Sequence, residues 1–255
     1  MGIKGANSRR PILTRGQIEL RAAAFAYCFD SHAFEHQSSP IYLIAKGLIE
    51  RCNVPIHFRQ NLGCGPKGGT VLGRFDFSPA RILIDASLTE DSPRFRWTLC
   101  HEIGHYALHR TIDLRRISRR DSLVDTRIEL FRTRTAGWSD AHWIEWQANK
   151  FAAALLLPKP ILNRALLTIQ NDLAIPRCGQ IYVDDQPQNL RDFRTIMAYL
   201  ASRLGALKSM ILYRLSDLGL LTDARTATRT SGQHVLALRA IVSSALNREL
   251  SARNR

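Results

Sequence analysis

Residues 94–109, RFRWTLCHEIGHYALH, determine how the rest of the chain is interpreted. They contain His101, Glu102 and His105 in the pattern HExxH, within an apolar run typical of a buried helix. Positions i and i+4 of a helix lie on one face, so His101 and His105 can both bind one Zn²⁺ at about 2.0–2.1 Å. Glu102 is then close enough to act as a general base on water. The alternative is a helix with two stacked histidines and a surface glutamate.

A catalytic zinc usually has three protein ligands and one open position, so a third ligand is expected elsewhere. Residues 143–158, WIEWQANKFAAALLLP, place Glu145 in an otherwise apolar helical segment. A carboxylate that faces a core is costly unless it is paired or metal-bound, which makes Glu145 the strongest candidate. His142 and His109 are the alternatives. Asn149 lies four residues further on the same face, where its side chain can hydrogen-bond one of the histidines.

The sequence around these two stretches predicts an α+β fold. The glycine-rich segment 63–69 lacks a GK[ST] ending and a following helix, which favours a hairpin connection over a phosphate-binding loop. Ser92 suits the N-cap, and Pro93 suits the first turn, of the helix that carries HExxH. A proline-rich, polar spacer is expected at 159–189. We expect further helices at 16–34, at 41–52 and from Ser139 or Asp140 to Leu157, and strands at 54–58, 70–77 and 81–85.

The composition excludes several classes of protein. A hydrophobic fraction of 45% in 255 residues is typical of a globular core and excludes a wholly disordered chain. No apolar run reaches the roughly 18 residues of a membrane span, and the first residues contain no apolar block of signal-peptide length. We therefore expect a cytoplasmic protein without a membrane partner. The five cysteines include no CxxC pair, which argues against a disulfide framework or a cysteine zinc site.

The formal net charge of +14 indicates contact with nucleic acid or another polyanion. A candidate location is residues 195–222, where Ala201, Gly205 and Ile211 have the spacing of a helix-turn-helix. The alternative, which we favour, is a helical hairpin with a structural or partner-binding role. Candidate contacts to DNA or a partner on the second helix are Lys208, Ser209, Tyr213 and Arg214.

The two quoted stretches resemble the ImmA/IrrE family of metallo-endopeptidases, whose typical patterns are RFTLAHELGHxLLH and ExxANxFAxxLLMP. The resemblance covers roughly residues 40–160 and extends more weakly through the C-terminal helices. It implies that His101, His105 and Glu145 are zinc ligands and that Glu102 is the catalytic base.

The chain departs from the family patterns in three places. Cys100 stands where a small residue such as alanine is usual, and Leu157 stands where methionine is common. The arginine-rich segment 110–134, before the helix of the third ligand, is longer than typical. None of these departures removes a ligand, and the long segment is expected to alter substrate access.

The resemblance implies a zincin-like fold in which a small antiparallel sheet packs on the two ligand-bearing helices. We expect a tail and helix at 1–39, a zinc metallopeptidase core at 40–160 and a helical C-terminal region at 161–255. The edge of the sheet at 70–86 is a candidate for binding the substrate backbone. Candidates for stabilising the oxyanion are Tyr106, His109 and His142.

The function implied is that of a cytoplasmic zinc-dependent endopeptidase. Its expected substrate is a helix-turn-helix transcriptional repressor, whose cleavage derepresses stress, phage or mobile-element genes. One Zn²⁺ is expected per chain, and Mn²⁺ or Fe²⁺ fits the same ligands. The alternative is a DNA-binding transcriptional regulator in which the zinc site is structural.

Overall fold

The computed structural model describes residues 13–65, 69–111, 140–176 and 178–225. The predicted basic tail, the arginine-rich segment 110–134 and the last ten residues lie almost entirely outside these ranges. The chain divides into two compact units, and each is described by itself. The first unit holds α1 (Arg15–Phe29) with Tyr42–Thr89 and Thr98–Leu155, and the second holds His32–Ile41, Glu90–Trp97 and the chain from Leu156.

The first unit contains the elements that the sequence predicted around the two motifs. Two of the predicted helix boundaries are confirmed: α2 ends at Cys52, and the Ser92 hydroxyl accepts a hydrogen bond from the Phe95 N–H at 3.2 Å. α1 ends at Phe29, earlier than predicted, because the chain becomes extended at Asp30. The remaining elements are α2 (Ile41–Cys52), β1 (Ile56–Gln60), β2 (Gly73–Phe77), β3 (Ala80–Asp85), α3 (Pro93–His109) and α4 (Asp140–Leu156). Of α3, the part from Thr98 onward belongs to this unit.

The three strands form one mixed sheet in the order β1-β3-β2. β2 pairs antiparallel with β3, but β1 pairs parallel with β3, so the prediction of an antiparallel sheet is wrong for β1. The reason is that the chain reverses direction after β1 and again after β2, which leaves β1 and β3 pointing the same way. In the glycine-rich connection, an antiparallel bridge joins Cys64 to Thr70, in agreement with the predicted hairpin.

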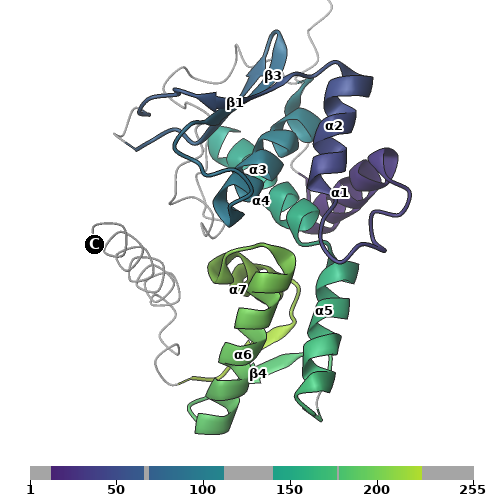
Figure 1. Cartoon of the computed structure of the whole chain (residues 1–255), viewed down its shortest axis with the longest axis vertical. Coiled ribbons are helices and arrows are strands. Elements are labelled where there is room, and N and C mark those ends of the chain that lie inside the picture. Colours follow the sequence, from purple (N-terminus) through teal and green to yellow (C-terminus); the bar gives the residue numbers. More distant parts are fainter. Residues whose placement is uncertain (1–12, 66–68, 112–139, 177, 226–255) are drawn as a thin grey trace, which may run out of the picture. The chain divides into compact units, whose positions relative to one another are not determined.

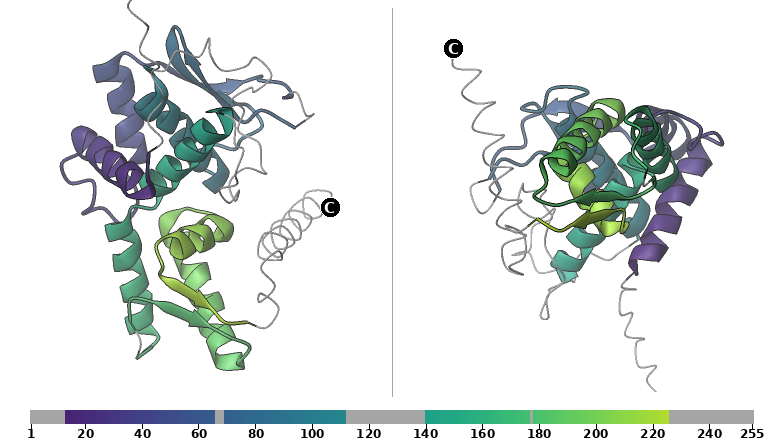
Figure 2. Two further views of the ribbon diagram at one scale, coloured as in Figure 1. Left: turned by 180° about the vertical axis from the view of Figure 1, so that it is seen from behind. Right: turned by 90° about the horizontal axis from the view of Figure 1, so that it is seen from below.

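Helix α3 lies in the middle of the first unit. In Figures 1 and 2 the strands lie on one side of the unit and α1 and α2 on the other, with α3 and α4 between them. Ring contacts join these layers: Tyr106 of α3 packs edge-on against Phe75 of β2 and Phe25 of α1. Phe25 also meets Phe151 of α4. His101, Glu102 and His105 are at most 3% exposed, so the HExxH motif is enclosed by protein.

The second unit contains a helix that was not predicted from the sequence. Residues 159–172 form α5 (Lys159–Asp172), so the predicted spacer is wrong there. Pro160 is tolerated because it stands in the first turn, where no helical N–H partner is lost. The sequence pattern that could have predicted α5 is an apolar stripe at helical spacing. Its buried members are Ile161, Leu162, Ala165, Leu166 and Ile169.

The predicted helix pair near the C-terminus is present in the second unit. α6 (Pro187–Leu204) and α7 (Lys208–Asp217) are joined at Gly205, whose φ of 58° gives the left-handed turn that glycine tolerates best. Two short strands, β4 (Ile181–Val183) and β5 (Leu221–Asp223), flank the helices and pair in parallel. The sequence analysis did not predict them, because three-residue strands are too short to show an alternating pattern.

The state of the cysteines and the length of the apolar helices bear on two expectations from the sequence. All five cysteines are free, as expected for a chain without a disulfide framework. Within the described ranges, no single helix has both the length and the hydropathy of a membrane span. α4 and α5 reach these values only together, as a pair bent by 50°.

Candidate metal centre

The structure brings together one carboxylate and two imidazoles from the two predicted stretches. His101 and His105 lie one turn apart on α3, and Glu145 faces them from α4. The Nε2 atoms of the two histidines are 3.0 Å apart. The Glu145 carboxylate lies 3.2 Å from His101 Nε2 through one oxygen and 3.5 Å from His105 Nε2 through the other. All three side chains are at most 8% exposed, so bulk water does not separate them.

These distances match what a metal ion requires of its ligands. Ligands that surround zinc tetrahedrally at about 2.0–2.1 Å lie about 3.3 Å from one another. The three observed separations, from 3.0 to 3.5 Å, bracket that value. The group can therefore hold a divalent metal ion without rearrangement of its side chains.

The protonation of the two histidines also favours a cation at this point. His101 Nδ1 lies 2.9 Å from Asn149 Oδ1, so Nδ1 carries the proton that the amide oxygen accepts. Burial, together with the neighbouring His101 and His109, holds the pKa of His105 well below its usual value, so this ring is neutral. Lone pairs of imidazole nitrogen and carboxylate oxygen then converge on one buried point. A divalent cation removes the repulsion between them and offsets the cost of the buried carboxylate.

Glu102 lies on α3 beside the ligands and faces the sheet. It is 2% exposed. A Cβ atom placed on Gly73 of β2 would stand 2.6 Å from Glu102 Oε1 and 2.5 Å from Thr98 Cγ2. Only glycine at this position leaves room for the carboxylate against the strand. Gly73 thus belongs to the site, although the sequence analysis did not single it out.

Gly104 is explained by the close approach of α4. A Cβ atom at Gly104 would lie 3.1 Å from the Ala148 carbonyl oxygen and 3.3 Å from Phe151 Cδ1. Glycine within a helix costs about 1 kcal/mol relative to alanine, and this close approach explains why glycine stands here. The short distance between the two helices allows Glu145 to reach the histidines of α3.

The other candidate ligands and oxyanion stabilisers, His109, Tyr106 and His142, lie outside the group formed by His101, His105 and Glu145. His109 does not join the metal-ligand group. Its Nδ1 lies 3.2 Å from Nδ1 of His105, on the side of that ring away from Glu145. Tyr106 packs between Phe25 and Phe75, away from the ligands. His142 is partly exposed one turn before Glu145 on the same face of α4, so it remains a candidate for stabilising the oxyanion.

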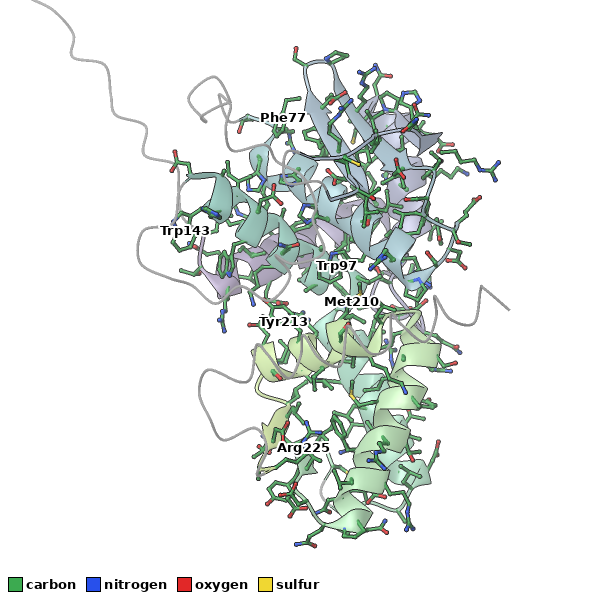
Figure 3. The ribbon with its side chains drawn as sticks, turned by 90° about the vertical axis from the view of Figure 1, so that its left-hand side faces the viewer. Phe77, Trp97, Trp143, Met210, Tyr213 and Arg225 are labelled. Carbon is green, nitrogen blue, oxygen red and sulfur yellow. The ribbon has the colours of Figure 1, made fainter. Side chains whose placement is uncertain are left out.

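The predicted contacts on α7 differ in exposure. Lys208 is exposed, and Ser209 and Tyr213 are partly exposed, the last of them labelled on α7 in Figure 3. Arg214 is fully buried, and its Nε donates a hydrogen bond to the Leu157 carbonyl at 3.0 Å. Its prediction as a contact to DNA or a partner is therefore wrong. The guanidinium satisfies backbone at the end of α4 instead.

Comparison with known proteins assigns the family. The sequence matches the IrrE N-terminal-like domain, Peptidase_M78, over residues 65–216, which is more than half of the chain. No curated protein matches it. Among solved structures, a Mycobacterium tuberculosis transcriptional regulator is similar at a TM-score of 0.41 and 15% identity, over 84% of this chain and 53% of that chain. This chain thus spans about half the length of that structure. The chain belongs to the IrrE N-terminal-like family, Peptidase_M78, which is the ImmA/IrrE family that its two motifs resemble.

Proposed function

We propose that the protein is a zinc-dependent endopeptidase. The observation that carries the proposal is the convergence of His101, His105 and Glu145 on one buried point, with Glu102 beside them. Two imidazoles and one carboxylate are a usual ligand set of catalytic zinc, which keeps one position open. A structural zinc site is instead closed by four protein ligands, and the described part of the chain brings three together.

The chemistry follows from the positions of these side chains. A bound zinc ion supplies Lewis acidity, which polarises a peptide carbonyl and makes water more acidic. Glu102 accepts the proton of the attacking water on its carboxylate and returns it to the nitrogen of the leaving amine. The missing side chain at Gly73 leaves this carboxylate its space against β2.

The substrate backbone is proposed to add to β2. This strand lies at one edge of the sheet, where its outer N–H and C=O groups can pair with an extended peptide. Glu102 touches the same strand at Gly73, so a peptide on this edge passes close to the base. By family resemblance, the proposed substrate is a helix-turn-helix transcriptional repressor, cut in the cytoplasm to switch on the genes that it controls.

The test is cleavage of candidate repressors by the purified protein loaded with zinc. Glu102→Gln is expected to retain stoichiometric zinc and to lose cleavage, because the amide cannot accept the proton. Glu50→Gln is the matched control, since Glu50 is exposed on α2 and pairs only loosely with Lys46 at 3.9 Å. Cleavage by the Glu102→Gln variant at the unmodified rate would refute the assignment of the base.

The same experiment distinguishes the proposed endopeptidase from the alternative, a DNA-binding regulator. Salt-sensitive, sequence-selective binding to duplex DNA, with zinc retained and no repressor cut, would favour a DNA-binding regulator with a structural metal. Lys208, which is exposed at the start of α7, is the basic α7 candidate for that contact, since Arg214 is buried. Lys208→Ala is expected to leave cleavage unchanged in the endopeptidase proposed here.

A further inference from the structure

His109 is a buried histidine for which the reaction outlined above has no role. It is the last residue of α3, one turn beyond His105, and it is 1% exposed. We propose that His109 is a positioning residue, which accepts a hydrogen bond from Nδ1–H of His105 and so holds that ring in the tautomer that binds metal through Nε2. The inference rests on the metal site of the proposed function, and it concerns metal binding rather than peptide cleavage.

The tautomer follows from the distances around His105. Its Nε2 faces the centre, 3.0 Å from His101 Nε2 and 3.5 Å from Glu145 Oε1. A nitrogen that binds metal offers a lone pair, so the proton of the neutral ring must be on Nδ1. That atom lies 3.2 Å from His109 Nδ1. His109 must then accept at Nδ1, and its own proton is placed on Nε2.

The acceptor matters because His105 is only 3% exposed. A buried N–H group that loses its partner costs about 1–3 kcal/mol, and in a metal site the loss also frees the ring to turn or to move its proton to Nε2. His101 has its own acceptor, Asn149 Oδ1, which comes from α4. Each imidazole ligand therefore has a separate acceptor, one on the facing helix and one on α3 itself.

A purely packing role for His109 is the competing explanation, and a pair of substitutions separates the two. His109→Asn keeps an acceptor, because the Oδ1 atom of asparagine stands at the same branch point as Nδ1 of histidine. His109→Leu has a similar size and no acceptor. Both variants remove most of the ring, so any cost of lost packing is shared between them.

The experiment measures zinc affinity by competition with a chromophoric chelator, alongside thermal unfolding of the metal-free proteins. We expect His109→Leu to bind zinc about 10–100-fold more weakly than the unmodified chain, as is typical when an acceptor behind a metal ligand is lost. His109→Asn should recover most of that affinity, while the two metal-free variants unfold at similar temperatures. Equal affinity of the two variants, whether both high or both low, would overturn the proposal.

A spectroscopic measurement tests the tautomer directly. In long-range ¹H–¹⁵N NMR spectra of the zinc-loaded protein, His109 is expected to be neutral with its proton on Nε2. A proton on Nδ1 of His109 would overturn the proposal. Zinc binding without peptide cleavage would refute the proposed function and leave this inference standing, whereas a chain that does not bind zinc would refute both.

Discussion

Gly73→Ala tests whether β2 and Glu102 are fitted to each other. The substitution adds one methyl group to a buried position of the strand. That methyl would stand 2.5 Å from Thr98 Cγ2 and 2.6 Å from Glu102 Oε1, whereas non-bonded heavy atoms normally approach to about 3.5 Å. The Thr98 methyl and the Glu102 carboxylate must therefore each move by about 1 Å away from the added methyl. The backbone of Gly73 is not in the left-handed region, so the effect is steric.

The expected losses differ for stability and activity. Overpacking of this size costs about 1–3 kcal/mol of unfolding free energy. Displacement of a reacting group by about 1 Å costs on the order of 100-fold in rate, so kcat for peptide cleavage should fall by that factor. Zinc content should stay unchanged, because the three atoms nearest to the added methyl belong to Thr98 and Glu102 and not to a proposed metal ligand.

A second substitution separates the two contacts. Thr98→Ser removes Cγ2 and keeps the hydroxyl, so the Gly73→Ala/Thr98→Ser variant should regain part of the lost stability. Its activity should stay low, because the methyl still meets the Glu102 carboxylate. Gly16→Ala is the control, since a Cβ atom at that exposed position meets nothing within 4 Å. Full activity of Gly73→Ala, measured as kcat on a cleaved repressor, would refute the fit between strand and base.

Three further predictions concern the framework of the two units. The pKa of the Asp85 carboxyl lies below its usual value: burial alone would raise it, but hydrogen bonds from the Ser87 side chain and from backbone N–H groups, including that of Leu62 at 2.9 Å, together lower it. The carboxylate therefore stabilises the fold above the unfolded pKa of about 3.9, and this stabilisation is lost as pH falls through the lower folded pKa. Asp85→Asn should lower the unfolding free energy, measured by urea unfolding, by about 1–3 kcal/mol at pH 7 and by less near pH 2. Gly104→Val should destabilise the first unit by about 1–3 kcal/mol and weaken zinc binding, because its Cβ would lie 3.1 Å from the Ala148 carbonyl oxygen; unchanged zinc affinity would contradict the tight α3–α4 packing. Arg214→Met should lower the unfolding free energy by about 1–3 kcal/mol by leaving the Leu157 carbonyl without its donor, and a variant as stable as the unmodified chain would show that this hydrogen bond contributes nothing.

The metal-ligand group could be predicted from sequence because each half of it is local. His101 and His105 are placed together by the helical repeat alone, and the cost of burying Glu145 in an apolar helix points to a partner. Asn149 follows from the same repeat on α4, and its oxygen lies 2.9 Å from the ring of His101. His109 continues the series on α3, but sequence does not distinguish a ligand from an acceptor behind a ligand.

The missed features depend on contacts between elements that are distant in sequence. Gly73 belongs to the site only because β2 passes over α3, and no local pattern marks that crossing. The parallel pairing of β1 with β3 depends on which strands become neighbours, which alternation within each strand does not encode. Arg214 was misread because a basic residue on a short helix usually faces solvent, whereas here a backbone carbonyl at the end of α4 receives it.

Helix α3 has a separate partner on each of its faces, and this limits where specificity can reside. Glu102 meets β2, Gly104 meets the backbone of α4, and Tyr106 packs against α1. The ligands and the base therefore cannot move independently, as a preorganised site requires. In the proposed endopeptidase, selection among substrates is then expected from residues at the rim. In the first unit these are the outer edge of β2 and the start of α4, where His142 and Trp143 are partly exposed. Trp143 is labelled in Figure 3. In the endopeptidase proposed above, the chemistry is fixed in the core of the unit, and the choice of peptide is made at its edge.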